Sequence, residues 1–332
     1  MFRTSPARLS LESEPHAPTG AQVDGARVEE VKFRFRVEYL AAAGVLGVLG
    51  FLPRRLARGL CEALAAGSYI LWPRLRQVGL FNLRMVFPEW SERQRRRVLF
   101  GTFQGFGRML ADFAHFPRLT RKNIEDLIVY DGFEHYARAH AQGKGVIFLT
   151  AHFGNWELSS FAHSLYGHPL NFTVRPMDNP LLDAMITRYR CSSGGRPVDK
   201  NDFARRALQA LRQGEAVGVL MDTNMLPPEG IFVDFFGRLA STTSAPARLA
   251  RKTGAALVLG LALWDRKSRK YRLHFEPVPW IDHDDPEEEV RLNTEHFNRL
   301  IEDQVRRYPD QWFWVHRRWK TRAPGEPPLY PF

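Results

Sequence analysis

The sequence predicts an α/β protein with a mixed, mostly parallel sheet that is flanked by helices. Short, continuously apolar segments such as residues 146–150 and 216–221 are typical of strands buried on both faces. Segments with helical periodicity separate these strands, so strand and helix alternate along the chain. The 332 residues, 44% of them hydrophobic, suffice for a large core, which excludes a disordered or fibrous protein.

The N-terminal part of the chain differs from the rest. Residues 1–30 are rich in Pro, Ser, Gly, Ala and Glu, and we expect a disordered tail there. The first apolar run, residues 39–52, begins too late for a secretory signal peptide. As a helix it would be about 21 Å long, too short to cross a hydrocarbon core of about 30 Å. Together with an amphipathic pattern at residues 56–72, it predicts a membrane-associating helical segment at 31–77 that is an interfacial or re-entrant anchor. A tilted signal-anchor helix and a buried core helix are the alternatives.

We assign residues 78–322 to one globular domain and residues 323–332 to a C-terminal tail. Ser91 and Gln94 form a capping box, which predicts a helix running to about residue 115. Strands are expected at residues 127–130, 146–150, 171–174, 216–221, 257–263 and 271–275. Helices are expected up to residue 142, from residue 155, and at residues 181–190, 203–212, 245–252 and 287–307. A long loop rich in Pro and Gly is expected between the strand 216–221 and the helix 245–252.

Positive charge is concentrated in two segments of the chain. The formal net charge is +11, and residues 54–97 contain ten basic and three acidic residues, while residues 299–322 contain seven and three. Such clusters suit the phosphate groups of nucleic acid, anionic lipid or a phosphorylated glycolipid, or an acidic carrier protein. A genomic preference for Arg is the alternative explanation of the excess, but it does not explain the clustering. Only two cysteines occur, which excludes a disulfide framework and a Cys-rich zinc module.

The segment 145–160 carries the most informative polar residues. It leads from a buried strand into a helix, and ligands of open α/β sheets bind beyond the carboxyl ends of the strands. Residues five apart in one helix point about 140° apart, so His152 must lie in the turn before the helix if it is to meet Glu157. We expect Glu157 to accept a hydrogen bond from one ring nitrogen of His152, which leaves the other nitrogen free to take a proton from a hydroxyl group. A histidine in a core or capping role is the alternative.

Four sequence blocks, in this order, resemble the lipid A biosynthesis (late) acyltransferase family, which lies within the glycerolipid acyltransferase superfamily. The first block contains the superfamily's spacing of a histidine and an acidic residue five positions later. The resemblance covers about residues 82–322. The blocks are HFGNWE at 152–157, VRPMDNPLLD at 174–183, the strand and Asp at 218–222 with IFVDFFGR at 231–238, and YPDQWFWVHRRWKTR at 308–322.

The resemblance implies an acyltransferase that moves a fatty acyl chain from an acyl thioester, of acyl carrier protein or coenzyme A, to a hydroxyl of an anionic membrane glycolipid. A lipid A precursor is the favoured acceptor. His152 would be the general base and Glu157 would orient it. Asp222 follows a strand and is expected to bind the acceptor or to brace His152, with a helix cap or a turn as the alternative role. The expected substrate-binding residues are Arg175, Asn155, Asp222 and Arg238.

The acidic run at 282–289 leads into a helix and suits the positive end of its dipole, so we expect no metal site there. No cofactor is expected either. The expected location is the cytoplasmic face of the plasma (inner) membrane, with nucleic acid excluded as a partner. Side chains expected at the membrane surface are Arg93, Arg95, Arg96, Arg97, Trp312, Trp314, Arg317, Arg318, Trp319 and Lys320.

Two other functions stay open at this point. One is an acyltransferase for another glycolipid, such as phosphatidylinositol mannoside. The other is a basic peripheral membrane-binding protein without enzymatic activity. A serine hydrolase is disfavoured because the sequence contains no Gly-x-Ser-x-Gly motif.

Overall fold

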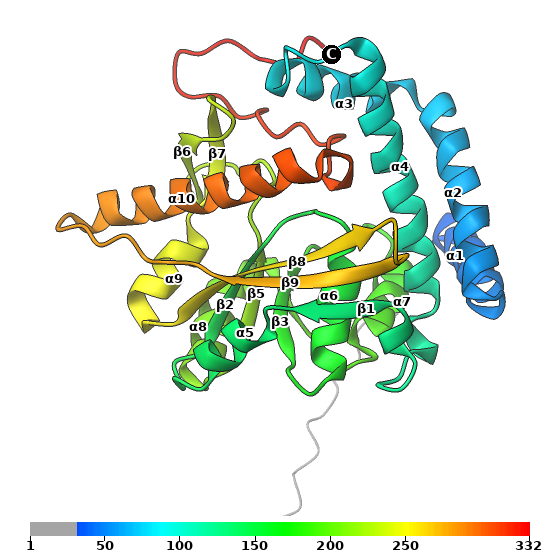
Figure 1. Ribbon diagram of the computed structural model, residues 1–332, viewed down its shortest axis with the longest axis horizontal. Helices are drawn as coiled ribbons and strands as arrows, with labels where there is room; N and C mark the ends of the chain where they lie inside the picture. Colours follow the sequence, from blue (N-terminus) through cyan, green and yellow to red (C-terminus); the bar gives the residue numbers. More distant parts are fainter. Residues whose placement is uncertain (1–31) are drawn as a thin grey trace, which may run out of the picture.

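The computed structural model describes residues 32–332, and a seven-stranded sheet lies at its centre (Figure 1). The strands of this sheet are β1 (Ile128–Asp131), β2 (Val146–Thr150), β3 (Leu170–Val174), β4 (Arg196–Asp199), β5 (Ala216–Leu220), β8 (Ala256–Asp265) and β9 (Lys270–Pro277). They lie in the order β1-β9-β8-β2-β5-β3-β4, and only the β8–β9 pair is antiparallel. A second, two-stranded sheet consists of β6 (Gly230–Asp234) and β7 (Leu239–Thr243). The expected mixed, mostly parallel sheet is confirmed, while the expected tail at residues 1–30 lies outside the described residues.

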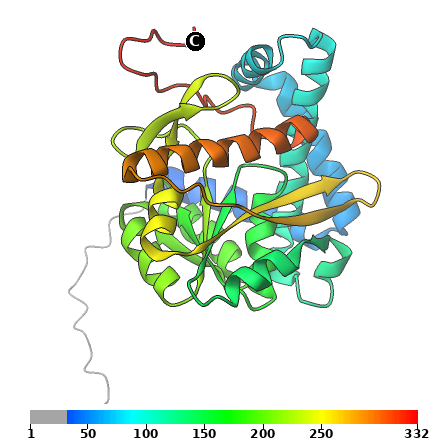
Figure 2. The same cartoon turned by 60° about the vertical axis from the view of Figure 1, so that its left-hand side comes forward.

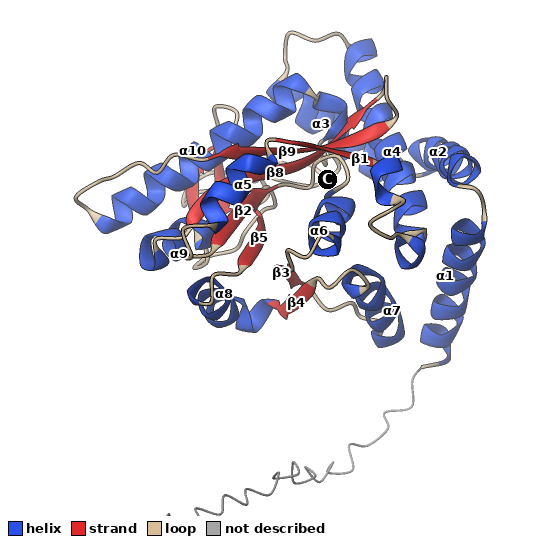
Figure 3. Ribbon diagram, turned by 60° about the horizontal axis from the view of Figure 1, so that its bottom comes forward, coloured by secondary structure: helices blue, strands red, loops and turns tan. Residues whose placement is uncertain are grey.

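Helices lie on both sides of the main sheet (Figure 3). The α-helices of the described residues are α1 (Phe33–Phe51), α2 (Arg54–Leu71), α3 (Pro73–Val86), α4 (Glu92–Ala114), α5 (Phe133–His140), α6 (Trp156–Leu165), α7 (Pro180–Cys191), α8 (Phe203–Arg212), α9 (Ala245–Thr253) and α10 (Pro286–Arg307). Short 3-10 helices occur at Phe116–Arg118, Ile124–Asp126, Lys200–Asp202 and Pro309–Gln311. The capping box at the start of α4 is present as expected.

The central strands are buried on both faces because each face packs against its own core. Ile147 and Leu149 of β2 join the core that contains residues of α8, α9 and α10. Val146 and Phe148 join the core that contains residues of α5 and α6. Side chains of a strand alternate between its two faces, so a strand covered on both sides needs an unbroken apolar run. This explains why β2 and β5 are recognisable in the sequence.

The β6–β7 hairpin lies in the segment that the sequence suggested to be a loop. Its turn requires positive φ at two successive residues, Phe236 at 57° and Gly237 at 73°. Helix α10 crosses between the hairpin and the main sheet (Figure 2), and Asn298 of α10 donates a hydrogen bond to the backbone carbonyl of Asp234 over 2.9 Å. The hairpin thus depends on contacts with a helix that follows it by more than forty residues, which the local pattern does not reveal.

Helices α1 and α2 expose an apolar surface, called here the apolar face. Among residues 32–332, no helix combines the length and the apolar character that crossing a membrane requires. The opposite side of α2, which includes Ala57, Arg58 and Cys61, is buried. The apolar face consists of Phe33, Val37, Leu40, Val45, Val48, Phe51, Leu56, Leu60, Leu64, Ile70, Leu71 and Trp72.

The buried side of α2 lies directly against α4, which runs beside it (Figure 1). At the closest point, a Cβ atom added to Gly107 of α4 would lie 2.5 Å from the carbonyl oxygen of Cys61 of α2. Only glycine allows the two backbones to approach this closely. The contact therefore fixes the position of α2, and with it the part of the apolar face that α2 contributes.

Replacing Gly107 with Ala is expected to lower the free energy of unfolding by about 1–3 kcal/mol, because the added methyl group overlaps the backbone of α2. The matched change Gly105→Ala in the same helix brings its methyl group no closer than 3.7 Å to another side chain. That control is expected to raise the free energy of unfolding by up to about 1 kcal/mol, through helix propensity. Chemical denaturation measures both, and equal effects would contradict this account of the α2–α4 contact.

Candidate active site

His152 lies where the carboxyl ends of two neighbouring parallel strands meet. It follows β2, and Asp222 follows β5, the parallel neighbour of β2. Thr150 pairs with Leu220 in the register of the two strands, and the amide of Met221 donates to the carbonyl oxygen of Thr150 over 3.0 Å. This register places residues 152 and 222 side by side although they are far apart in the sequence.

The Asp222 carboxylate binds His152 at two points. The ring Nδ1 of His152 donates to Oδ1 over 2.9 Å, and the backbone amide of His152 donates to Oδ2 over 2.9 Å. Trp312 adds a third donor, its indole Nε1, at 2.8 Å from Oδ2. Because a carboxylate only accepts, the proton of the neutral imidazole lies on Nδ1, which leaves the Nε2 lone pair available. Within the described part of the chain, Nε2 has no hydrogen-bond partner.

The buried pair changes the ionisation of both partners. Burial opposes protonation of His152, but the charge and hydrogen bond of Asp222 outweigh it and raise the pKa of His152. Burial also disfavours the Asp222 carboxylate, yet the His152 charge and the three hydrogen bonds lower the pKa of Asp222. Asp222 therefore stays ionised and stabilises the imidazolium that would form if Nε2 took a proton.

Glu157 does not accept a hydrogen bond from His152, so the expected partner is wrong. The Glu157 carboxylate instead accepts two hydrogen bonds from Arg190 of α7, at 2.9 Å from Nε and 2.5 Å from Nη2. The reason is that Glu157 lies in the first turn of α6, facing α7, while Asp222 already occupies Nδ1 of His152. Glu157 is still near enough for its charge to contribute to the raised pKa of His152.

The turn that carries His152 packs closely against β8 and against the segment that contains Gln311. Gly154 has a positive φ of 59°, and a Cβ atom there would lie 1.8 Å from the carbonyl oxygen of Ala262 in β8. Its amide donates to the carbonyl oxygen of Gln311 over 2.8 Å. Glycine at this position is what allows the turn before the helix.

Asn155 is the N-cap residue of α6, and its side chain is buried. Its Oδ1 accepts a hydrogen bond from the Leu158 amide over 3.0 Å, and its Nδ2 donates to Asp112 Oδ2 over 3.2 Å. Asn155 and Asp222 are both buried and bonded to protein groups, so neither offers a free group to a substrate. The expectation that they bind substrate is corrected: Asn155 supports the turn and Asp222 braces His152.

Two aromatic rings contact the His152 ring. Trp156 meets it edge to face at a centroid distance of 5.1 Å, and Phe313 stacks on it at 5.4 Å. His316 stacks on Phe313 at 6.1 Å, and its Nε2 accepts a hydrogen bond from the Asn224 amide over 2.9 Å. Burial lowers the pKa of His316 to about 4, so this second histidine is neutral at physiological pH. The rings restrict the orientation of His152.

Arg175 and Arg238 are exposed on different elements. Arg175 follows β3 at the same edge of the sheet as His152, and Arg238 lies in the β6–β7 turn. Within residues 32–332, neither guanidinium forms an ion pair with a carboxylate. Both groups are thus accessible to an anion, although the structure does not bring Arg238 together with His152.

The tryptophans near the C-terminus do not form a membrane-facing belt, and that expectation is wrong. Trp312, Trp314 and Trp319 are buried in the core, where Phe235 contacts two of them at centroid distances of 5.6 and 5.7 Å. Arg318 is buried as well, and its guanidinium donates to the Ser241 carbonyl oxygen over 2.7 Å. These side chains form the back of the site, behind Asp222. The sequence showed a run of basic and aromatic residues but not that the chain folds inward there.

The acidic run at residues 282–289 caps α10. Asp285 accepts hydrogen bonds from the amides of Glu287 and Glu288, at 2.7 and 3.1 Å. Glu287 and Glu289 form ion pairs with arginines of α9. The interpretation of this run as a helix start is confirmed.

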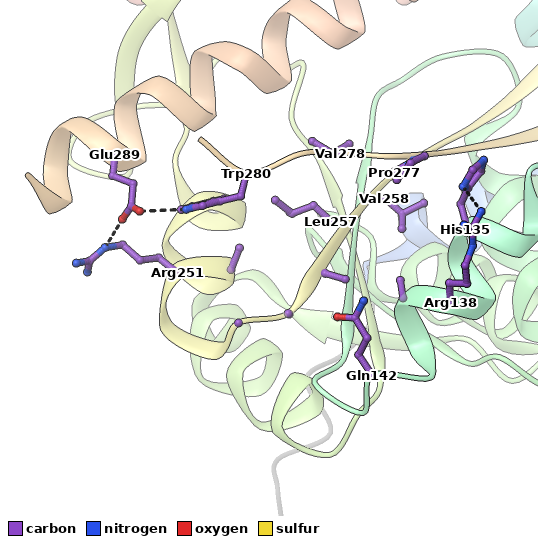
Figure 4. A pocket seen from close by; sticks show the side chains of 15 residues that line it. His135, Arg138, Gln142, Arg251, Leu257, Val258, Pro277, Val278, Trp280 and Glu289 are labelled. Atoms are coloured by element: carbon purple, nitrogen blue, oxygen red, sulfur yellow. Dashed lines mark hydrogen bonds and ion pairs between the residues drawn. The ribbon is translucent and has the colours of Figure 1, made fainter. Parts of the chain in front are cut away.

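A cavity of about 620 Å³ lies away from His152, at the amino end of β8 (Figure 4). The amino ends of β8 and β2 are paired at Val146 and Ala256, so this cavity lies at the edge of the sheet opposite to His152. Polar groups of its rim bind one another: Glu289 accepts hydrogen bonds from Trp280 and Arg251. The position separates this cavity from the chemistry of the His152 turn.

Sequence comparison agrees with this geometry. The family model described as bacterial lipid A biosynthesis acyltransferase matches residues 29–321. The lipid A biosynthesis lauroyltransferase of Escherichia coli (strain K12) is 31% identical over 250 residues, which cover 75% of this chain and 80% of the relative. The lipid A biosynthesis palmitoleoyltransferase of the same strain is 28% identical over 288 residues, or 86% of this chain and 92% of the relative. A lipid A biosynthesis acyltransferase of Haemophilus influenzae is 26% identical over 279 residues, or 84% and 86%. Because the family model matches nearly the whole length of the sequence, the chain belongs to the bacterial lipid A biosynthesis acyltransferase family.

Proposed function

We propose that this acyltransferase moves a fatty acyl chain from an acyl thioester, of acyl carrier protein or coenzyme A, to a hydroxyl of a lipid A precursor. The observation that carries the proposal is the His152–Asp222 pair, which leaves Nε2 free at the carboxyl edge of the sheet. The family and the names of the relatives support the class of acceptor. Other anionic glycolipids with a free hydroxyl are the acceptors that the experiment below distinguishes.

In the proposed reaction, Nε2 of His152 removes the proton of the acceptor hydroxyl while the hydroxyl oxygen attacks the thioester carbonyl carbon. The imidazolium is stabilised by the Asp222 carboxylate on Nδ1. When the tetrahedral intermediate collapses, the C–S bond breaks and the leaving thiolate takes the proton from Nε2. The product is an ester, and His152 returns to its neutral form.

Negative charge that develops on the thioester oxygen needs nearby donors. Arg175, exposed at the same edge of the sheet, supplies a guanidinium that suits an oxyanion or a phosphate of donor or acceptor. The amino end of α6, which follows His152 directly, supplies backbone amides. Glu157 contributes negative charge near the histidine, and its ion pair with Arg190 links α6 to α7.

The protein is proposed to associate with the cytoplasmic face of the inner membrane as an interfacial protein. The apolar face of α1 and α2 would enter the boundary between headgroups and acyl chains. Arg93, Arg96 and Arg97 are exposed at the start of α4 and, within residues 32–332, form no ion pair. Arg95 differs, because it is buried and donates to the carbonyl oxygens of Phe87 and Pro88. The expected contribution of Arg95 to membrane docking is therefore withdrawn.

The His152→Ala variant is expected to lose acyl transfer by at least about a hundredfold, because no other group takes the hydroxyl proton. Mass spectrometry of glycolipids, incubated with the donor and either enzyme, measures the gain of one acyl chain and identifies the acceptor. Circular dichroism confirms that the variant is folded. A folded variant with wild-type transfer would exclude His152 as the base, and no mass change in any glycolipid with the wild-type enzyme would contradict the proposed function.

The Asp222→Asn variant is expected to shift the pH dependence of the reaction. The base acts when neutral, so the wild-type rate rises with pH through the pKa of His152, which Asp222 raises. Without the charge of residue 222, the rising limb moves to lower pH, while the plateau rate falls by about a hundredfold or more because the imidazolium is no longer stabilised. Rates measured across the pH range test both effects; an unchanged limb would show that Asp222 does not control the pKa of His152.

Membrane binding is expected to have separable apolar and charged parts. The variant with Leu56, Leu60 and Leu64 changed to Ser should lose binding to neutral and anionic vesicles alike. The variant with Arg93, Arg96 and Arg97 changed to Gln should lose more than about tenfold in affinity for anionic vesicles only, at about 1 kcal/mol per charge. Vesicle sedimentation at several salt concentrations measures both. Undiminished binding of the leucine variant would contradict the apolar face as the membrane contact.

A further inference from the structure

A chain of buried polar contacts connects α2 with the turn that carries His152. The side chain of Arg58 in α2 donates from Nε to Asp112 Oδ1 over 2.9 Å. The second oxygen of Asp112, Oδ2, accepts from Nδ2 of Asn155 over 3.2 Å. Helices α2, α4 and α6 lie in this order beside one another (Figure 3), so the three residues bridge all three elements. All three side chains are buried.

The members of this chain have few other polar partners, among them the Tyr271 hydroxyl and the Arg269 carbonyl oxygen. The Arg58 guanidinium lies over the ring of Trp264 at 5.0 Å, with no other carboxylate bound to it in the described residues. Burial raises the pKa of Asp112, and Arg58 opposes that rise. Asn155 uses its oxygen to cap α6 and its amide to reach Asp112. Removing Asp112 would therefore leave the buried Arg58 cation with only the Arg269 carbonyl oxygen, at 3.4 Å, as a hydrogen-bond acceptor, and would take from the Asn155 amide its acceptor in Asp112, which is costly.

We infer that Asp112 is a positioning residue for the reaction, which holds the His152 turn through Asn155 and fixes that turn to α2 through Arg58. The inference rests on the proposed function for the role of His152. Asp112 itself touches neither His152 nor an accessible surface. Its effect is transmitted through the cap of α6, three residues after His152, so loss of the contact loosens the turn and misplaces Nε2.

The position of α2 gives this contact a second consequence. The outer side of α2 contributes Leu56, Leu60 and Leu64 to the apolar face, while its inner side contributes Arg58 to the chain of contacts. The helix proposed to meet the lipid surface is thus bonded, through the side chains of Arg58, Asp112 and Asn155, to the turn that carries His152. The same contacts therefore connect the proposed membrane-docking surface with the turn that positions His152.

The chain offers a matched control. Glu62 of α2 and Arg108 of α4 form a second ion pair between the same two helices, with 3.0 Å between Oε1 and Nη1. Glu62 does not contact Asn155. Glu62→Gln and Asp112→Asn are therefore the same chemical change at two ion pairs of one interface, of which only one continues to the His152 turn.

The test compares Asp112→Asn, Asn155→Ser and Glu62→Gln with the wild-type protein. Ser at 155 keeps an oxygen that can cap α6 but has no amide that reaches Asp112, and it leaves the Arg58–Asp112 pair intact. Hydrogen–deuterium exchange of peptides spanning residues 152–158 reports the turn, and this measurement needs no substrate. The variants Asp112→Asn and Asn155→Ser are expected to exchange about tenfold faster there, and Glu62→Gln is expected to match the wild type.

The kinetic measurement separates positioning from general stability. Asp112→Asn and Asn155→Ser should lower kcat by about tenfold to a hundredfold while both KM values stay within about twofold, because the base is misplaced but the substrate surfaces are not. An unchanged turn in Asn155→Ser, or a Glu62→Gln variant as impaired as Asp112→Asn, would overturn the inference. If Asp112→Asn does not fold, Asn155→Ser decides the question. If the wild-type protein transfers no acyl chain, the proposed function fails while the exchange result still decides whether Asp112 holds the turn.

Discussion

The parallel pairing of β2 with β5 is the constraint on which the site depends. Both strands are buried on both faces, so a shift of one residue would reverse every side chain of the shifted strand relative to the two cores. That register brings the residues that follow the strands together, and His152 meets Asp222 as a result. His152 and the carboxylate that binds it are thus positioned by the apolar packing of the sheet rather than by a flexible loop.

Asp222, which binds His152, and Glu157, the acid five positions after that histidine, have different surroundings. Asp222 is buried and receives donors from the His152 ring and backbone and from Trp312. Glu157 is half-buried and forms a two-point pair with Arg190. One acid therefore fixes the tautomer of the histidine, while the other contributes a more distant charge and anchors α6 to α7. The spacing in the sequence identified Glu157, whereas the pairing of the sheet strands brings Asp222 to His152.

The elements that could be predicted from the sequence are those whose pattern is local. The apolar run of β2 and the capping box of α4 agree with the structure at these positions. The β6–β7 hairpin and the burial of Trp312 could not be predicted, because contacts with α10 and with Phe235 decide them. The same holds for the site: His152 was recognised from its turn, and Asp222 was noted after a strand. The sequence left several roles open for Asp222 and could not single out its hydrogen bond with the His152 ring, and no local pattern links Asp112 to Asn155.

The Gln311 carbonyl oxygen that accepts the hydrogen bond of the Gly154 amide shows which part of the chain completes the site. Trp312, the next residue, completes the hydrogen bonds of Asp222. Both residues are synthesised long after the sheet strands that they support. The site is therefore completed by a segment that lies far along the chain from both β2 and β5, and a chain without residues 311 and 312 lacks two of the contacts that hold it.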